Sequence, residues 1–411
     1  MTAIGFNRRF FASTSARLNQ TDLIPVKQGE FSPKKVVVLR KLTRYEYEQT
    51  YWNTKNDDKL KPILKALGSN FDGLVQRHDE YCTALDKILQ TFKDYRIDAQ
   101  VVDRSEYDEN LLKGVDAVFS AGGDGTFLLA ASKIFNQNIP LIGITTDPLR
   151  SEGYLCIPKS LSRQFDKALG FLLSSKFKWM FRNRIRLTMS GRYGSIRQQN
   201  LHDQHLQSPE NRFLEHVQEN ELHSWPNENL QQLPPTCLPI RALNEVFIGE
   251  TLSSRVSFYE MSVNDETPQK QKSSGITICT GTGSSSWYFN INHLSRNSVE
   301  NLLKIVKEEN PKCSINTNDE LLIRKIARKF NQSLIFSAWE NKMAYTVRDP
   351  VLNGIFQVSN PKGFCQKMRV KSRMWDACVV IDGGVSYSFN EGAIVEMSML
   401  KEDALKTVSF L

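Results

Sequence analysis

The sequence predicts a Rossmann-like α/β domain followed by a β-rich, sandwich-like domain. Between residues 34 and 146, strand-like and helix-like segments alternate, which is typical of a parallel sheet covered by helices. After about residue 180, strand-like segments follow one another with few helices between them. A chain of 411 residues is long enough for two domains with cores of their own.

Short apolar runs rich in β-branched residues predict the strands of the first domain, at residues 34–40, 99–103, 115–121 and 139–146. Helices are predicted over 81–95, where Leu85, Ile88, Leu89 and Phe92 share one face, and over 126–135. In the second domain the predicted strands are 184–191, 242–250, 256–263, 275–281, 368–373 and 377–384, interrupted by helices near 298–309 and 318–330.

These patterns divide the chain into a leader at 1–30, an α/β domain at 31–180, a β-rich domain at 181–395 and a tail at 396–411. Within the second domain, residues 192–240 contain 7 Gln, 5 Asn and 5 Pro. Such a segment buries too little apolar surface to order itself, so we expect a flexible insertion. A metal site at His202 and His205 is the less favoured alternative.

The amino-acid composition limits which classes of protein the chain can belong to. The net charge is +8, and Arg8, Arg9 and Arg17 lie in a leader of 20 residues without an acid. This leader predicts a mitochondrial transit peptide. The remaining charge is mild and suits small anionic ligands without requiring nucleic acid. No apolar run is long enough for a membrane span. Seven scattered cysteines without a Cys-x-x-Cys pair argue against a disulfide framework or zinc site.

The loop Gly122-Gly123-Asp124-Gly125-Thr126 lies between a predicted strand and a predicted helix. Backbone N–H groups and the helix dipole at such a junction bind phosphate, and glycines let the backbone approach it closely. Because a carboxylate repels phosphate, Asp124 indicates another task, such as taking a proton from a hydroxyl or holding Mg²⁺. The loop therefore predicts phosphoryl transfer to an alcohol. A tight turn capped by Asp124 is the plainer alternative.

Two further segments carry polar residues in suitable places. Asn244 and Glu245 interrupt an apolar strand, and a buried amide and carboxylate side by side can bind the two hydroxyls of a ribose. A strand edge that faces water would also explain them. The loop 279–289, "CTGTGSSSWYF", follows a strand and offers hydroxyl groups to phosphate or ribose, although a serine-rich turn has the same appearance.

In this order, the three loops resemble those of the NAD kinases. "GGDGT" at 122–126 is similar to the signature loop of that family, with Asp124 at its catalytic aspartate. "NE" at 244–245 matches the pair that holds the NAD riboses, and "TGTGSSSW" at 280–287 is similar to the family's Thr-Pro-Thr-Gly-Ser-Thr-Ala-Tyr loop. "VVIDGG" at 379–384 resembles its C-terminal Asp-Gly strand. "TDPLRSEG" at 146–153 and "TGTGS" are similar to the mitochondrial branch.

The resemblance implies an NAD kinase/diacylglycerol kinase-like fold and an enzyme that phosphorylates the adenosine-ribose 2′-hydroxyl of NAD to give NADP. It implies ATP with Mg²⁺ as the donor, with polyphosphate as an alternative, a homodimer, and a place in the mitochondrial matrix. Nucleic acid and membrane are not implied as partners. Asp124 is the expected catalytic residue, and no metal-ligating residue is assigned. The expected nucleotide-binding residues are Gly122, Gly123, Gly125, Thr126, Asn244, Glu245, Thr282, Gly283, Ser284 and Ser285.

The chain departs from the family in two places. Ser274-Gly275 stands where the family has Asp-Gly, whose aspartate contacts the nicotinamide end, so recognition there must differ. Residues 145–155 replace the family's Asn-x-Gly-x-Leu-Gly-Phe. Two rival functions stay open, a lipid kinase with the same glycine loop and a non-catalytic NAD(P)-binding regulator. The cation for the donor phosphate is also open, with Arg150 and Lys272 near the loops.

Overall fold

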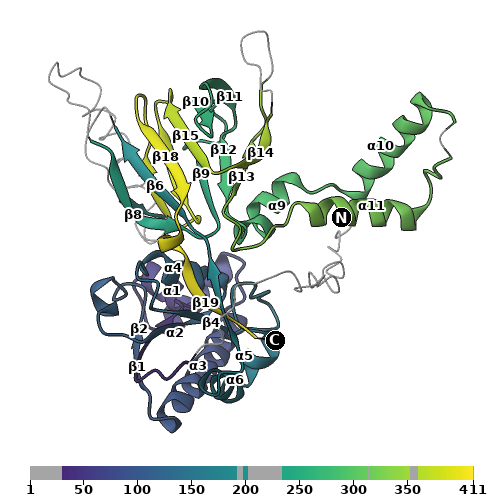
Figure 1. Cartoon of the computed structure of the whole chain (residues 1–411). Helices are drawn as coiled ribbons and strands as arrows, with labels where there is room; N and C mark the ends of the chain where they lie inside the picture. The colour runs from purple at the N-terminus through teal and green to yellow at the C-terminus, as the bar shows by residue number, and fades with distance from the viewer. Residues whose placement is uncertain (1–29, 192–197, 202–233, 313, 352–359, 411) are drawn as a thin grey trace.

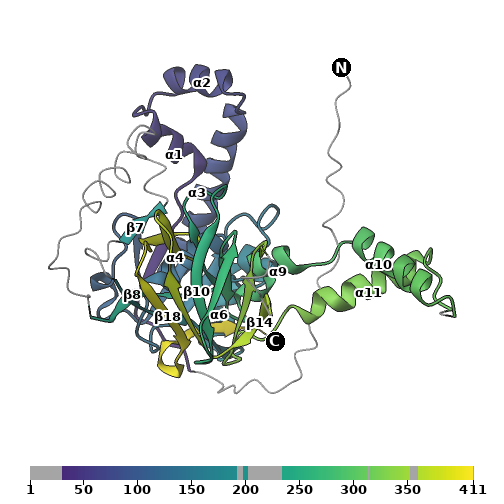
Figure 2. The same ribbon diagram turned by 90° about the horizontal axis from the view of Figure 1, so that it is seen from above.

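A computed structural model describes residues 30–191, 198–201, 234–312, 314–351 and 360–410. Figure 1 shows two domains, one above the other, with a pair of helices that projects sideways as an arm. Seen from above in Figure 2, the arm again extends away from both domains. The predicted leader and most of the predicted insertion lie outside the described residues.

The first domain is built on a parallel sheet. It contains β1 (Lys35–Arg40), β2 (Asp98–Val102), β3 (Ala117–Gly122) and β4 (Leu141–Thr145), in the order β2-β1-β3-β4. Residues 36–39 of β1 are fully buried because both faces of the sheet are covered. The strand order reverses between β1 and β3, and ligands of open α/β sheets bind at such a point, beyond the carboxyl ends of the strands.

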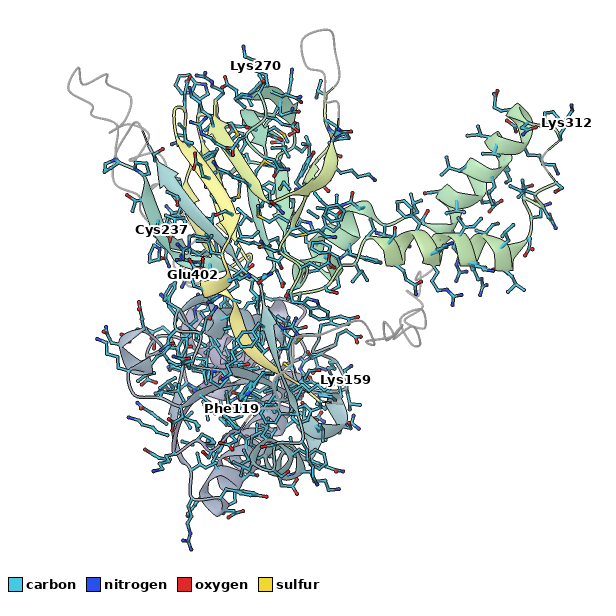
Figure 3. The ribbon with its side chains drawn as sticks, viewed as in Figure 1. Phe119, Lys159, Cys237, Lys270, Lys312 and Glu402 are labelled. Carbon is cyan, nitrogen blue, oxygen red and sulfur yellow. The ribbon has the colours of Figure 1, made fainter. Side chains whose placement is uncertain are left out.

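Helices cover this sheet, and Phe119 of β3 lies in the interior of the domain (Figure 3). The helices of this domain are α1 (Arg44–Tyr51), α2 (Asp57–Ala66), α3 (Phe71–Asp94), α4 (Asp124–Ser132), α5 (Lys159–Arg163) and α6 (Phe165–Leu173), of which α1 and α2 pack on α3. Polar caps fix several of the helix starts: Thr43 and Glu46 form a capping box before α1, and Asn70 caps α3. Phe127 on α4 is fully buried against the sheet, which holds this helix close to the end of β3.

The second domain packs two antiparallel sheets face to face. The six-stranded sheet has the order β11-β10-β15-β18-β6-β8, and the seven-stranded sheet has the order β14-β13-β12-β9-β16-β17-β7. The strands are β6 (Ile185–Ser190), β7 (Gln198–Asn200), β8 (Thr236–Ala242), β9 (Glu245–Glu250), β10 (Ser257–Val263), β11 (Gln269–Ser273), β12 (Ile276–Cys279), β13 (Met343–Val347), β14 (Lys362–Cys365), β15 (Lys367–Ser372), β16 (Ala377–Ile381), β17 (Val385–Ser388) and β18 (Ile394–Met399). One apolar core lies between the sheets.

The end of the chain differs from the predicted tail. Residues 396–399 belong to β18, inside the six-stranded sheet, and β19 (Leu405–Ser409) pairs antiparallel with β5 (Lys178–Arg182). Val408 packs into the core of the first domain, so the last strand ties the two domains together. A short apolar strand such as β19 is held by this pairing, which no local pattern reveals. Likewise, β7 and β8 are ordered strands inside the predicted insertion.

The arm consists of α10 (Arg296–Glu309) and α11 (Glu320–Ser333), after the short α9 (Trp287–Asn292). Both long helices were predicted from the sequence; the end of α10 at residue 309 agrees, and the other three ends differ by two or three residues. Lys312 lies near the far end of the arm (Figure 3). The helices share a small core of Val299, Ile323 and Ala327. In the described part of the chain, no helix combines the length and hydropathy that a membrane span requires.

Candidate active site

The loop 122–126 joins β3 to α4, as predicted, and Gly123 is the N-cap of the helix. Gly122 and Gly123 are needed for packing as well as for the binding of phosphate. A Cβ on Gly122 would lie 2.2 Å from the Thr126 hydroxyl, and one on Gly123 would lie 3.2 Å from Ser151. Gly125 is exposed with open space around it. The N–H groups of this first helical turn can therefore be approached by an anion.

Asp124 is the first residue of α4, and backbone amides orient its side chain. The N–H of Leu155 donates to Oδ1 at 2.8 Å, and the N–H of Tyr154 donates to Oδ2 at 3.1 Å. Gly153 makes this turn possible with a left-handed φ of 62°. The carboxylate has further lone pairs for a hydroxyl donor. Residues 145–155, where the sequence departs from the family pattern, therefore have a function here. Their backbone amides fix the direction of the Asp124 carboxylate.

A cleft of about 310 Å³ opens between α1, α3 and the segments that follow β1 and β4, and it reaches the glycine loop through Thr146, whose N–H donates to the Gly122 carbonyl. Lys41, directly after β1, lines it together with Thr146, directly after β4. The Lys41 N–H donates to the Ala121 carbonyl, and its ammonium lies 4.7 Å from the centre of the Tyr81 ring. Burial lowers the pKa of Lys41, and Asp147 opposes this shift. The Thr146 hydroxyl is buried and has no hydrogen-bond partner among the described residues.

Asn244 and Glu245 lie where the chain passes from β8 in one sheet to β9 in the other. They are only 8% and 9% exposed, so the alternative of a water-facing strand edge is wrong. Asn244 Oδ1 and Glu245 Oε2 are buried without a hydrogen-bond partner in the part of the chain that the structure describes. Burial, and secondarily the charge of Asp382, raises the pKa of Glu245 to about 8. Two unpartnered oxygens side by side match a ligand with adjacent hydroxyl groups, because a hydroxyl can both donate and accept.

The loop after β12 packs directly on the Asn244 turn. The Thr280 hydroxyl donates to the Leu243 carbonyl, and the Thr280 N–H donates to the Asn244 carbonyl at 2.9 Å. A Cβ on Gly283 would lie 2.1 Å from that same carbonyl oxygen. Only a glycine allows this close approach. The second and third predicted motifs therefore form one unit.

The hydroxyls of this loop have different surroundings. Ser284 is fully buried, and its hydroxyl donates to the Gly281 carbonyl and accepts from the Phe336 N–H. It therefore holds the loop, whereas the sequence assigned it to ligand binding. The Thr282 hydroxyl accepts from Arg182 at 3.4 Å, and Ser285 is exposed.

Arg182, at the end of β5, connects the loops of the two domains. Its Nη1 donates to Thr282, while its Nε is buried and has no acceptor among the residues that the structure describes. Burial lowers the pKa of Arg182 to about 10, and the nearby Asp124 carboxylate opposes that shift. The guanidinium thus lies between the Asp124 loop and the Thr282 loop. Sequence reasoning missed it because one arginine at a strand end carries no distinctive spacing.

Comparison with known proteins agrees with this arrangement. No protein-family model matches the chain. The "NAD kinase 2, mitochondrial" of Homo sapiens is 43% identical over 383 residues, covering 92% of this chain and 85% of the relative. That of Rattus norvegicus is 42% identical over 382 residues, with 92% and 88% covered.

The chain belongs to the mitochondrial NAD kinase family. A solved structure, that of a yeast NADH kinase complexed with NADH, has a TM-score of 0.50 and 13% identity, covering 92% of this chain and 84% of that one. It confirms the fold of an NAD kinase.

Two other expectations concern charged residues near the site of this NAD kinase family member. Arg150 is exposed and paired with Asp147 and Glu80, and the Lys272 ammonium lies over the Phe258 ring on the six-stranded sheet. Lys41 is placed better for an anion in the cleft. Among the described residues, no cluster of three or more His, Cys, Asp or Glu side chains forms a metal site.

Proposed function

We propose that this chain uses ATP to phosphorylate the 2′-hydroxyl of the adenosine ribose of NAD, giving NADP. The main support is the pair of buried, unpartnered oxygens on Asn244 and Glu245, which lie in one unit with Thr282. Arg182 extends this unit toward Asp124. A ribose bound by these two side chains can present its hydroxyl to the carboxylate at the start of α4. Family membership is consistent with the same reaction.

Asp124 is the proposed general base. Its two amide bonds to residues 154 and 155 fix the carboxylate while leaving lone pairs for the attacking hydroxyl. A positioned base contributes roughly 10²–10⁴-fold to such a reaction. Transfer of a phosphoryl group otherwise depends on alignment and on neutralising negative charge. The cationic Arg182 is suitably placed for the second task.

The donor phosphates are proposed to lie between the amides of Gly122, Gly123, Gly125 and Thr126 and the cleft beside them. Lys41 is the proposed cation on this side, because it lines the cleft and its main chain is bonded to the end of β3. Its ammonium has no ion-pair partner among the described residues within 4.0 Å. Burial without a fixed counter-ion leaves this charge available to a phosphate. Thr146 offers a further hydroxyl.

Magnesium fits this site in the manner usual for nucleotide kinases. Mg²⁺ commonly binds through one or two carboxylates together with substrate phosphates, so it requires no protein cage. Asp124 begins α4 inside the glycine loop, and Asp147, shortly after β4, lines the cleft, so these two carboxylates would hold the ion. When bound, the ion would neutralise charge on the phosphates.

The chain is proposed to work as a homodimer in the mitochondrial matrix, brought there by the leader at 1–30. The names of the relatives support a mitochondrial location. The arm supports the homodimer, because Leu302 and Ile305 on α10 are more than half exposed. Apolar side chains on a projecting helix are typical of an association surface.

The deciding experiment measures NADP formation by the purified protein supplied with NAD, ATP and Mg²⁺, with diacylglycerol as a competing acceptor. The Asp124→Asn variant should lose about 10²–10⁴-fold in kcat. Its thermal stability should change little, since an amide still accepts one of the two backbone bonds. Wild-type NAD binding without NADP formation would support the regulator alternative.

Asp116→Asn is the matched control. Asp116 also accepts two backbone N–H groups, those of Lys34 and Lys35, but it lies at the amino end of β3, whereas Asp124 follows the carboxyl end of that strand. This variant should turn over NAD at the wild-type rate. If Asp124→Asn did the same, Asp124 would have no role in the chemical step.

A further inference from the structure

Asp382 lies in the "VVIDGG" segment, which has no role in the proposed chemical step. It lies in the turn between β16 and β17, with a left-handed φ of 49°. Aspartate tolerates this conformation better than most residues. The turn lies directly beneath the passage from β8 to β9, because the Asp382 N–H donates to the Glu245 carbonyl at 3.0 Å.

The Asp382 carboxylate accepts three consecutive main-chain N–H groups. Leu243 donates to Oδ2 at 2.8 Å, and Asn244 and Glu245 donate to Oδ1 at 2.8 and 3.0 Å. These amides need an acceptor because the chain changes sheets here, from β8 to β9. A buried N–H group without a partner is costly. The Asp382 carboxylate thus accepts the hydrogen bonds that the carbonyl groups of a neighbouring strand would otherwise accept.

The other side of the same passage carries the ligand-facing groups. Asn244 Oδ1 and Glu245 Oε2 are buried without a hydrogen-bond partner among the described residues, while the backbone amides of both residues are bonded to Asp382. The direction of both side chains therefore depends on how the main chain of residues 243–245 is held. Thr280 holds its carbonyl groups, and Asp382 holds its amides.

A carboxylate is the group that this arrangement requires. Three donors converge on two oxygens, and an ionised carboxylate offers about four acceptor sites and no donor. Asparagine would offer one oxygen and would turn its NH₂ toward an N–H group. Burial raises the pKa of Asp382 to about 6, although the three N–H bonds and Arg184 oppose the shift. The acid is consequently ionised above neutral pH, where it can accept all three bonds.

We propose that Asp382 is a positioning residue for NAD, which fixes the main chain of residues 243–245 so that Asn244 and Glu245 face the ribose. This inference rests on the proposed function. It assigns no contact with substrate to Asp382 itself. Loss of the carboxylate should therefore weaken NAD binding selectively and should leave the ATP side and the chemical step intact.

The test compares steady-state kinetics of Asp382→Asn with those of wild type, varying NAD and ATP separately. At least one of the three bonds must be lost, so we expect the KM for NAD to rise about tenfold. The KM for ATP and kcat should stay within about twofold of the wild-type values. Asp116→Asn, which alters a similar carboxylate–amide contact far from the site, should leave both KM values unchanged.

A general loss of structure would raise both KM values or lower kcat alone. Either result would overturn the proposal. An unchanged KM for NAD would overturn it as well. If Asp382→Asn fails to fold, Asp382→Glu carries the same test, because it keeps the acceptor chemistry but displaces the residue 243–245 passage. It should raise the KM for NAD and not that for ATP. Absence of NADP formation by wild type and Asp116→Asn would refute the proposed function instead.

Discussion

At the scale of the residue, the site retains groups that are unfavourable for folding. Glu245 is buried beside the acidic Asp382, and the thiol of Cys279 on β12 is close enough for Glu245 to raise its pKa. Asn244 and Glu245 also leave oxygens without partners. Such costs are characteristic of residues selected for binding. The sequence pointed to both residues, since an amide and an acid interrupt an apolar strand.

The free-energy cost of burying the Glu245 carboxylate should appear as a dependence of the unfolding free energy on pH. In the unfolded chain its carboxyl loses a proton near the ordinary pKa of about 4.5, whereas burial and Asp382 raise the pKa to about 8 in the folded protein. Between these values the folded state binds the extra proton, so stability falls as pH rises. Glu245→Gln cannot titrate. It should therefore be more stable than wild type at pH 8, by on the order of 1–3 kcal/mol.

Thermal unfolding at pH 4 and pH 8 tests this expectation. The difference in Tm between Glu245→Gln and wild type should widen with rising pH and nearly close at pH 4. Glu309→Gln, at an exposed glutamate at the end of α10, should show no such widening. A Glu245→Gln protein that was less stable than wild type at pH 8 would mean that the carboxylate is satisfied within the protein.

Residues that act alone were not predictable in the same way. Lys41 and Arg182 are ordinary cations at strand ends, and their sequence neighbourhoods contain other lysines and arginines. Their importance follows from the sheet order, which places Lys41 beside Gly122, and from the domain contact, which places Arg182 between two loops. Ser284 shows the reverse case, because its loop was predicted but its buried hydroxyl faces the protein.

At the scale of the element, local patterns were sufficient where burial is regular. The β1 and β3 strands are apolar on both faces, and α10 and α11 have a periodic apolar side, so all four were predicted. Neither β5 nor β19 was, since each is stabilised mainly by the other across more than 200 residues of sequence. Helices α1 and α2 were missed because their polar composition hides the few buried positions. The conformation of a loop such as 280–285 is set by its tertiary contacts with residues 243 and 244.

Gly283→Ala tests that contact. The added methyl group would overlap the backbone of Asn244, whose carbonyl oxygen lies 2.1 Å away, and backbone cannot move aside as a flexible side chain can. We expect a loss of about 1–3 kcal/mol in unfolding free energy and a raised KM for NAD. Gly384→Ala is the control, since its nearest neighbour is 4.0 Å away. Denaturant unfolding with equal midpoints for the two variants would contradict the close packing of the loop.

At the scale of the whole molecule, the site depends on both domains and on the strand that joins them. Arg184, fully buried, donates to the Ala131 carbonyl in the last turn of α4, to the Ile134 carbonyl just beyond that helix and to the Asp403 carbonyl before β19. The helix that carries Asp124 is thus anchored to the second domain. The domain classes were predicted correctly, but this connection was not, because it joins residues that are distant in sequence.

The arm is the remaining large feature, and it bears on the proposed homodimer. Its small core leaves a second stripe uncovered, with Leu302 52% exposed, Ile305 53% and Val306 44% along one side of α10, and Leu321 79% exposed on α11. Charges of both signs flank the stripe, for example Lys304 paired with Glu300. Such a surface is complementary to itself, as a two-fold symmetric interface requires. A second copy of the chain is therefore the partner that we expect.

The double substitution Leu302→Glu and Ile305→Glu should convert the dimer to a monomer, because two like charges would be buried against their symmetry mates. Light scattering during size-exclusion chromatography measures this directly. Leu67→Glu, at an equally exposed leucine on the first domain, should leave the dimer intact. Each protomer contains both halves of the site, so the monomer should still form NADP. A wild-type monomer, or a dimer that survives the double substitution, would place the association elsewhere or remove it.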